Sequence, residues 1–101
     1  MKTLTRPKFK LGQILATPGA LEALQRNETD GLEYLRRHVT GDWGTVCQDD
    51  AQLNDLAIRD GGRILSAYLL ADSTKIWVIT YATIDDQGNR EATTFLLPEE
   101  Y

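Results

Sequence analysis

Three short apolar segments near the end of the chain, separated by turn-forming residues, constrain its fold more than any other feature. Residues 63–70 are mostly apolar, and residues 75–81 (KIWVITY) are rich in the β-branched and aromatic side chains that pack well on a pleated sheet. Residues 92–97 form a third such segment, which ends at Pro98. Asp72-Ser73-Thr74 and the connection 85–89, which contains Gly88, separate the three. This pattern predicts a three-stranded antiparallel meander.

Helical patterns precede these strands. Thr17 and Pro18 are typical of a helix start, because a threonine hydroxyl accepts an unpaired backbone N–H and proline is tolerated at the first helical position. A second helix is expected from residue 29 or 30 to 39, and a third from residue 49 or 50 to the glycines at 61–62. The residues expected to face the core lie at helical spacing: Ala20, Leu21 and Leu24, then Leu32, Leu35 and Val39, then Leu53, Leu56 and Ala57.

The order of these elements predicts the fold class. Strand and helix patterns are segregated along the chain, which is typical of α+β proteins. We expect an N-terminal strand over Phe9–Ala16 and two to three short helices packed on a three- to four-stranded antiparallel meander, with the N-terminal strand at an edge. A length of 101 residues fits one domain. We therefore expect a basic, flexible arm over residues 1–8 and a single domain over residues 9–101.

Charge is unevenly spread along the chain. The net charge is −4, but residues 1–21 carry four basic side chains and no acid, so the remainder carries −8. Basic side chains are the groups that contact nucleic-acid phosphates. Nucleic acid is therefore expected to bind, if at all, only through the N-terminal arm.

Composition excludes several classes of protein. The single cysteine, Cys47, cannot form an internal disulfide. With one cysteine and one histidine the chain has too few ligands for a structural zinc site, and no metal or other cofactor is expected. No apolar run approaches the ~18 residues of a membrane span, so no membrane association is expected. These features predict a protein of a reducing, cytoplasmic compartment.

Five residues could carry ribonuclease chemistry of the RelE, barnase or colicin type, which needs a base, a cation and an acid around one phosphate. His38 is the only side chain with an ordinary pKa near neutrality. The candidates for the other roles lie on the predicted strands: Arg63, Tyr68, Thr93 and Thr94. The alternative interpretation of His38 is a histidine at a helix end, bonded to a backbone carbonyl or stabilised by the helix dipole.

Two further features suggest binding rather than catalysis. Asp42 and Trp43 lie between two glycines in an expected loop, and tryptophan is enriched at binding hot spots. Trp43 could instead pack on the core while Asp42 forms a turn. Four acids on or before the third helix could imitate nucleic-acid phosphates, as in an acidic inhibitor of a host defence nuclease, or form an ordinary solvated helix face: Asp49, Asp50, Asp55 and Asp60.

Four segments resemble a family of small, uncharacterised bacterial proteins found on plasmids and integrative elements. They are residues 11–21 (LGQILATPGAL), 38–44 (HVTGDWG), 63–68 (RILSAY) and 96–101 (LLPEEY). The resemblance spans nearly the whole chain, although residues 81–90 form a longer connection here. It implies a mobile-element context. Some members carry a label as a type I restriction methylation subunit, but this chain is too short for a methyltransferase. The function expected first is a non-enzymatic interaction module that binds a protein partner, with a homodimer through an exposed edge of the meander also possible.

Overall fold

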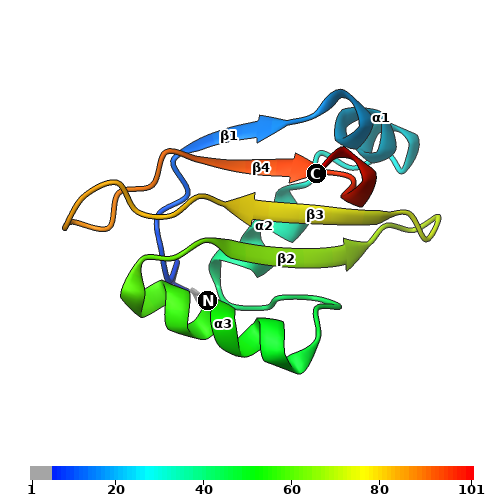
Figure 1. Ribbon diagram of the computed structural model, residues 1–101. Helices are drawn as coiled ribbons and strands as arrows, with labels where there is room; N and C mark the ends of the chain where they lie inside the picture. Colours follow the sequence, from blue (N-terminus) through cyan, green and yellow to red (C-terminus); the bar gives the residue numbers. More distant parts are fainter. Residues whose placement is uncertain (1–5) are drawn as a thin grey trace, which may run out of the picture.

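The computed structural model describes residues 6–101, and its strands and helices follow one another as shown in Figure 1. The first half of the chain contains one strand and three α-helices, and the second half contains three strands and a short 3₁₀ turn. Their bounds are β1 (Gln13–Ala16), α1 (Pro18–Arg26), α2 (Leu32–Val39), α3 (Gln48–Asp60), β2 (Ile64–Leu69), β3 (Lys75–Thr80), β4 (Ala92–Leu96) and η1 (Pro98–Glu100).

The four strands form one sheet in the order β1-β4-β3-β2. β2, β3 and β4 pair antiparallel in sequence order, which confirms the predicted meander. β1 pairs with β4 in the parallel direction, so the sheet is mixed and the prediction of a wholly antiparallel sheet is wrong. The parallel direction arises because the chain leaves β1 at the same end of the sheet as it leaves β4, and then passes through the helices before it returns.

β1 begins at Gln13, four residues later than the strand expected over Phe9–Ala16. Gly12 lies immediately before it with a φ of +66°, and a Cβ at this position would meet the carbonyl oxygen of Arg90. Only glycine adopts this left-handed conformation at such close backbone approach without strain. The extended conformation therefore starts after Gly12.

The described part of the N-terminal arm is attached to the domain. The backbone N–H of Lys8 donates to the carbonyl of Val39 over 2.8 Å, and Phe9 packs against the buried Trp43 and Ile64. Lys8, which was expected in a flexible arm, is thus bonded to the C-terminal end of α2. The prediction for residues 1–5 lies outside the described residues.

The helices begin close to their predicted starts, but some of their faces differ from prediction. Thr17 caps α1 by accepting a hydrogen bond from the N–H of Ala20 over 3.2 Å, as expected. α3 buries Asn54 and Ala57, whereas Leu53 and Leu56, which were expected in the core, are exposed. Leu21 of α1 and Leu32 of α2 are also exposed, contrary to prediction.

The rotation of α3 has a specific cause. The side-chain amide of Asn54 donates to the carbonyl of Leu65 over 2.7 Å, and its oxygen accepts the N–H of Leu65 over 3.1 Å. These two bonds turn Asn54 toward β2 and leave the leucines on the outer side of the helix.

The helices lie on one side of the sheet and along one of its edges. In Figure 1, α2 crosses behind the sheet, α3 runs along the outer side of β2, and α1 lies at the end of β1. The main core forms between α1, α2 and the rear face of the sheet, where alternate strand residues are buried: Tyr68, Ile76, Val78 and Phe95. A second, smaller cluster under α3 contains Trp43, Ala57 and Ile64.

No helix of residues 6–101 has the length and apolar character that a membrane span requires.

Candidate interaction surface

His38 is completely buried between α2 and the rear face of the sheet. Its Nδ1 lies 2.5 Å from the hydroxyl of Ser66 on β2, and its Nε2 lies 2.8 Å from the hydroxyl of Thr80 on β3. The hydroxyl of Thr80 also bonds that of Thr93 on β4, and Thr93 donates to the carbonyl of Leu11. A chain of polar groups therefore connects α2, three strands and the N-terminal segment.

Burial lowers the pKa of His38 to about 3, and the positive charge of Arg90 lowers it further in the same direction. The imidazole is consequently neutral at pH 7, and both of its nitrogens are already bonded. A general base must reach the substrate directly or through one water. His38 lacks that access in this structure.

The five residues considered for ribonuclease chemistry do not meet in one site. Tyr68 and Thr93 lie with His38 on the covered side of the sheet, where Tyr68 donates its hydroxyl to the carbonyl of Asp42 over 2.6 Å. Paired strand residues share a face, and Thr94 pairs with Ile79 and Leu15 on the opposite side. Arg63 also lies on that opposite side, against Tyr101.

The loop between α2 and α3 presents Asp42 but not Trp43. Trp43 is buried against Phe9, with ring centroids 6.2 Å apart, and its indole N–H donates to Asp55 over 3.0 Å. Asp42 is exposed; Arg37, at 2.7 Å, holds the pKa of its carboxyl below the usual range. Of the two predicted binding residues, only Asp42 is at the surface.

The outer edge of the meander at β2 is covered rather than free. The N–H of Thr45 donates to the carbonyl of Ala67 over 2.7 Å, and the N–H of Ala67 donates to the carbonyl of Trp43 over 3.1 Å. Asn54 bonds both backbone groups of Leu65, as described above. The other outer edge of the sheet is β1, which is only four residues long.

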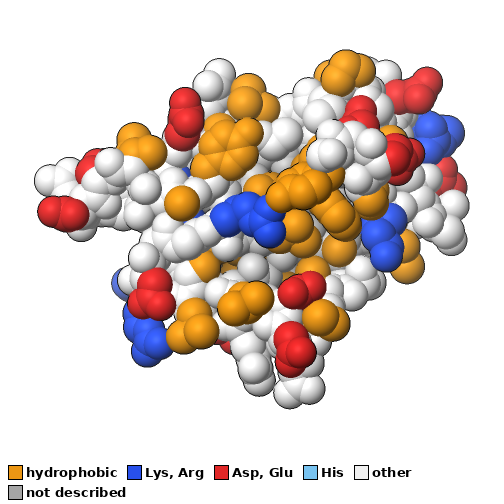
Figure 2. Space-filling view, viewed as in Figure 1, with side chains coloured by type: hydrophobic (Ala, Val, Ile, Leu, Met, Phe, Trp, Pro, Cys, Tyr) orange, Lys and Arg blue, Asp and Glu red, His pale blue; other side chains and the backbone are white. Residues whose placement is uncertain are grey.

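The front face of the sheet, in contrast, is covered by no α-helix of the described chain; only the short 3₁₀ helix η1 and Tyr101 contact it. The strand register places two rows of side chains across it: Leu65, Ile79, Thr94 and Leu15, and then Ala67, Trp77 and Leu96. Of these, Ala67, Ile79 and Leu96 are buried by their neighbours, and Leu15 is exposed. Leu69 and Tyr81 continue the same face and are exposed. We call this surface the open face. Figure 2 views the molecule from this side and shows hydrophobic side chains gathered over the sheet, with positive charge among them.

Tyr101 and Arg63 partly cover the centre of the open face. The ring of Tyr101 packs edge-on against Trp77, with centroids 5.6 Å apart. The guanidinium of Arg63 lies 5.6 Å from the centroid of the same tyrosine ring and donates to its hydroxyl. Both residues are themselves exposed, so the cover consists of two surface side chains rather than a packed layer.

A hollow of about 140 Å³ lies beside this pair, where α3 meets the front of β2. It is lined by Asp50, Leu53, Asn54, Arg63 and Leu65. The exposed Leu53 thus extends the apolar character of the open face onto α3.

The acids of α3 are exposed, and Asp55 is engaged by Trp43. Within residues 6–101, no group of three or more His, Cys, Asp or Glu side chains is arranged to hold a metal ion.

The open face was missed in the sequence, although residues 75–81 contain a signal for it. Trp77, Ile79 and Tyr81 alternate with Ile76 and Val78, so both faces of this strand are apolar. A strand with only one covered face ordinarily alternates apolar and polar residues. On this second face the chain itself covers Ile79, which is 4% exposed, and packs Tyr101 against Trp77, whereas Tyr81 is exposed.

Comparison of the chain with models of protein families, with curated proteins and with solved structures found no match.

Proposed function

We propose that this protein is a small, non-enzymatic interaction module that binds a protein partner through the open face. The observation that carries the proposal is a sheet whose front face has exposed Leu69, Tyr81 and Tyr101 and no α-helix over it. Exposed apolar side chains that gather on one face, as Figure 2 shows, are characteristic of contact sites.

The chemistry of the face defines the partner. Arg63 lies among apolar side chains and Lys75 lies at the margin, and neither forms a salt bridge within residues 6–101. Tyrosine, tryptophan and arginine are also the residues that dominate binding energy at interfaces. The partner surface that fits is apolar, with a carboxylate positioned to meet Arg63.

Two considerations favour binding over catalysis. The candidate catalytic residues lie on both sides of the sheet, and His38 is sealed in the core. The resemblance to small proteins of plasmids and integrative elements supports an accessory role in that context, with a partner in the cytoplasm.

Site-specific photo-crosslinking in cells tests the proposal. A photoreactive amino acid at Leu69 is expected to yield one adduct of defined mass, because this position is on the open face. The matched control is Leu56, an exposed leucine on the outer side of α3, which should not yield that adduct. An adduct with twice the mass of the chain would identify a second copy as the partner.

Charge reversal then tests the predicted chemistry. Arg63→Glu should weaken the Leu69 adduct, whereas Arg36→Glu, at an exposed position of α2, should leave it unchanged. The same adducts from both crosslinking positions, or none from Leu69, would contradict the proposal. Cleavage of RNA by the purified protein that is lost in His38→Ala would favour the ribonuclease alternative instead.

A further inference from the structure

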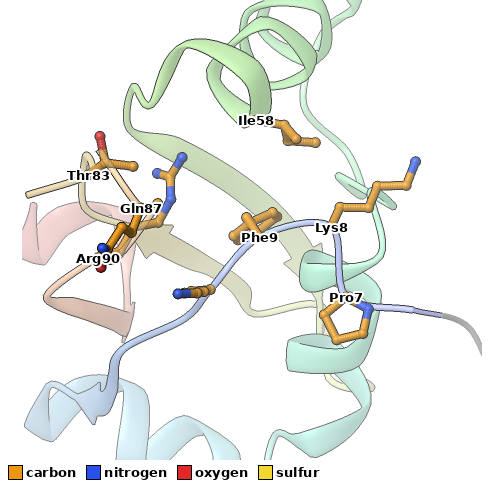
Figure 3. Close-up of a pocket in the computed structure, with 9 residues that line it drawn as sticks. Pro7, Lys8, Phe9, Ile58, Thr83, Gln87 and Arg90 are labelled. Atoms are coloured by element: carbon orange, nitrogen blue, oxygen red, sulfur yellow. The ribbon is translucent and has the colours of Figure 1, made fainter. Parts of the chain in front are cut away.

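A cavity of about 350 Å³ lies away from the open face, between the N-terminal segment, the end of α3 and the connection from β3 to β4. Its lining is Pro7, Lys8, Phe9, Lys10, Ile58, Thr83, Gln87, Gly88 and Arg90, several of which are drawn in Figure 3. We call it the basic cavity, because it is lined by three cations and, among residues 6–101, by no acid. Its volume is within the range of pockets that hold small molecules.

Arg90 is the unusual member of this lining, since it is only 5% exposed. Its Nη1 donates to the carbonyls of Gly62 and Tyr81 over 2.7 and 2.9 Å, and its Nη2 donates to the carbonyl of Ala57 over 3.1 Å. These bonds join the end of α3 to the sheet. They also fix the guanidinium in place, 5.6 Å from the centroid of the Phe9 ring.

The contacts of Arg90 leave its charge without an acid partner in the described chain. All three acceptors are neutral carbonyls, and no salt bridge forms at this residue. Burial lowers the pKa of the guanidinium, and no carboxylate acts to raise it. Its Nε–H has no acceptor within residues 6–101, and the nitrogen keeps some contact with solvent. Among residues 6–101, one donor of a buried cation is therefore without a partner.

The two lysines differ in how far their charge is offset. Lys10 donates to the side-chain oxygen of Asn89 over 3.0 Å, and Asn89 in turn donates to Asp85. Asp60, Asp85 and Asp86 line an adjoining hollow, which shares Ile58, Thr83 and Gly88 with the basic cavity. Lys8 lies at the rim, with its ammonium near Gly41. The basic cavity thus keeps an excess of positive charge in a chain whose net charge is −4.

Apolar groups complete the lining. Pro7, Phe9 and Ile58 line the cavity together with the cations, and Figure 3 shows Phe9 lying between Arg90 and Ile58. We propose that the basic cavity binds a small organic anion, with its phosphate or carboxylate near Arg90 and Lys10 and its apolar part against Phe9 and Ile58. Small-molecule sites obtain affinity from apolar side chains and orientation from a few fixed polar groups, and this cavity contains both kinds of group.

Titrations of the isotope-labelled full chain, followed by amide NMR shifts, test this site with three probes. Phenyl phosphate carries both the anion and the apolar part, inorganic phosphate carries only the anion, and benzyl alcohol carries only the apolar part. Phenyl phosphate is expected to shift the amides of Phe9, Lys10 and Gly88 and to bind more tightly than either other probe. Equal binding of phenyl phosphate and inorganic phosphate, or no shifts at these amides, would overturn the proposal.

A pair of charge reversals locates the binding. Lys10→Glu should reduce the affinity for phenyl phosphate roughly tenfold at low salt, because it replaces attraction by repulsion at close range. Lys75→Glu makes the same change of charge at an exposed position outside the cavity and should leave the affinity unchanged. Both residues are exposed, so neither variant removes a core contact. An equal loss in the two variants would show that only net charge matters and would overturn the site.

Discussion

At the scale of single residues, His38 connects elements that are far apart in the sequence. Its two ring nitrogens meet hydroxyls 28 and 42 positions away, on β2 and β3. Buried polar groups are stable only when they are hydrogen-bonded, and here both nitrogens are. The role that follows from these contacts is structural, in that a neutral imidazole joins α2 to the sheet.

This arrangement makes stability depend on pH. The pKa of His38 is about 3 in the folded protein and 6.5 when unperturbed. Between these values the unfolded chain binds a proton and the folded chain does not, so stability falls as the pH falls from 6.5 toward 3. At about 1.4 kcal/mol per pH unit, the free energy of unfolding should drop by roughly 2 kcal/mol between pH 6.5 and 5. Urea denaturation at a series of pH values measures this drop.

The range from pH 6.5 to 5 separates the effect of His38 on stability from the effects of the carboxylates. The lowered pKa of Asp42 and of Glu100 makes their contributions decline only at more acidic pH. His38→Gln, which lacks the titrating group, should show a much smaller change over the same range. A wild-type protein whose stability is constant from pH 6.5 to 5, or a His38 resonance that titrates near pH 6.5, would contradict the buried neutral imidazole.

The sequence predicted part of this residue's environment. Its position near a helix end was expected, but the expected partners were a backbone carbonyl or the helix dipole. The real partners, Ser66 and Thr80, are brought to it by the pairing of strands with α2. Contacts between residues so far apart leave no local pattern in the sequence. For the same reason, the burial of Arg90 was not predicted.

At the scale of elements, the local sequence predicted which helices and strands form. It predicted less well the direction in which strands pair and the face that a helix buries. The meander was predictable because its β-branched segments and its turns are adjacent in the sequence. The parallel pairing of β1 with β4 was not, because the two strands are separated by some 75 residues. The inward face of α3 was also missed, because the pattern of leucines outweighed one polar residue, Asn54.

The inward position of Asn54 predicts that its replacement lowers the free energy of unfolding. Asn54→Ala removes the partners of both the N–H and the carbonyl of Leu65 at the covered edge of β2. Leaving buried backbone groups unpaired costs about 1–3 kcal/mol. Urea denaturation should show a loss of this size, while Gln52→Ala, at an exposed position of the same helix, should stay within about 0.5 kcal/mol of wild type. Equal effects of the two changes would place Asn54 at the surface.

The start of α1 provides a second element-scale prediction. Thr17 accepts from the N–H of Ala20 and donates to the carboxylate of Glu100 over 2.5 Å, so it both caps the helix and holds the C-terminal turn. Thr17→Ala should lower the free energy of unfolding by about 1–2 kcal/mol, the usual loss for an N-cap. Thr17→Ser keeps the hydroxyl and should retain most of the stability. Thermal or urea unfolding of the two variants that gave equal losses would show that the methyl group, not the cap, matters.

At the scale of the whole molecule, the sheet has one face buried under helices and one apolar face without such cover. The polar chain of His38 and the main core lie on the first side, and the two proposed binding sites use other surfaces. The open face would bind a partner, and the basic cavity, at the end of α3 and beside the connection from β3 to β4, would bind a small anion. Each site therefore has variants that leave the other unchanged.

Adjacent leucines at the end of β2 test this two-faced architecture directly. Leu69 is 52% exposed on the open face, whereas Leu70 is 3% exposed in the core. Leu70→Asp places a carboxylate among apolar side chains and should cost more than about 3 kcal/mol or prevent folding, since buried charge without a partner is strongly unfavourable. Leu69→Asp should change the free energy of unfolding by about 0.5 kcal/mol or less. Urea denaturation at two protein concentrations measures both effects. A large loss in Leu69→Asp that shrinks as the protein is diluted would mean that a second copy covers the open face, because dilution removes the stabilising partner from the wild type. A large loss independent of concentration would mean that this face belongs to the core of the folded monomer.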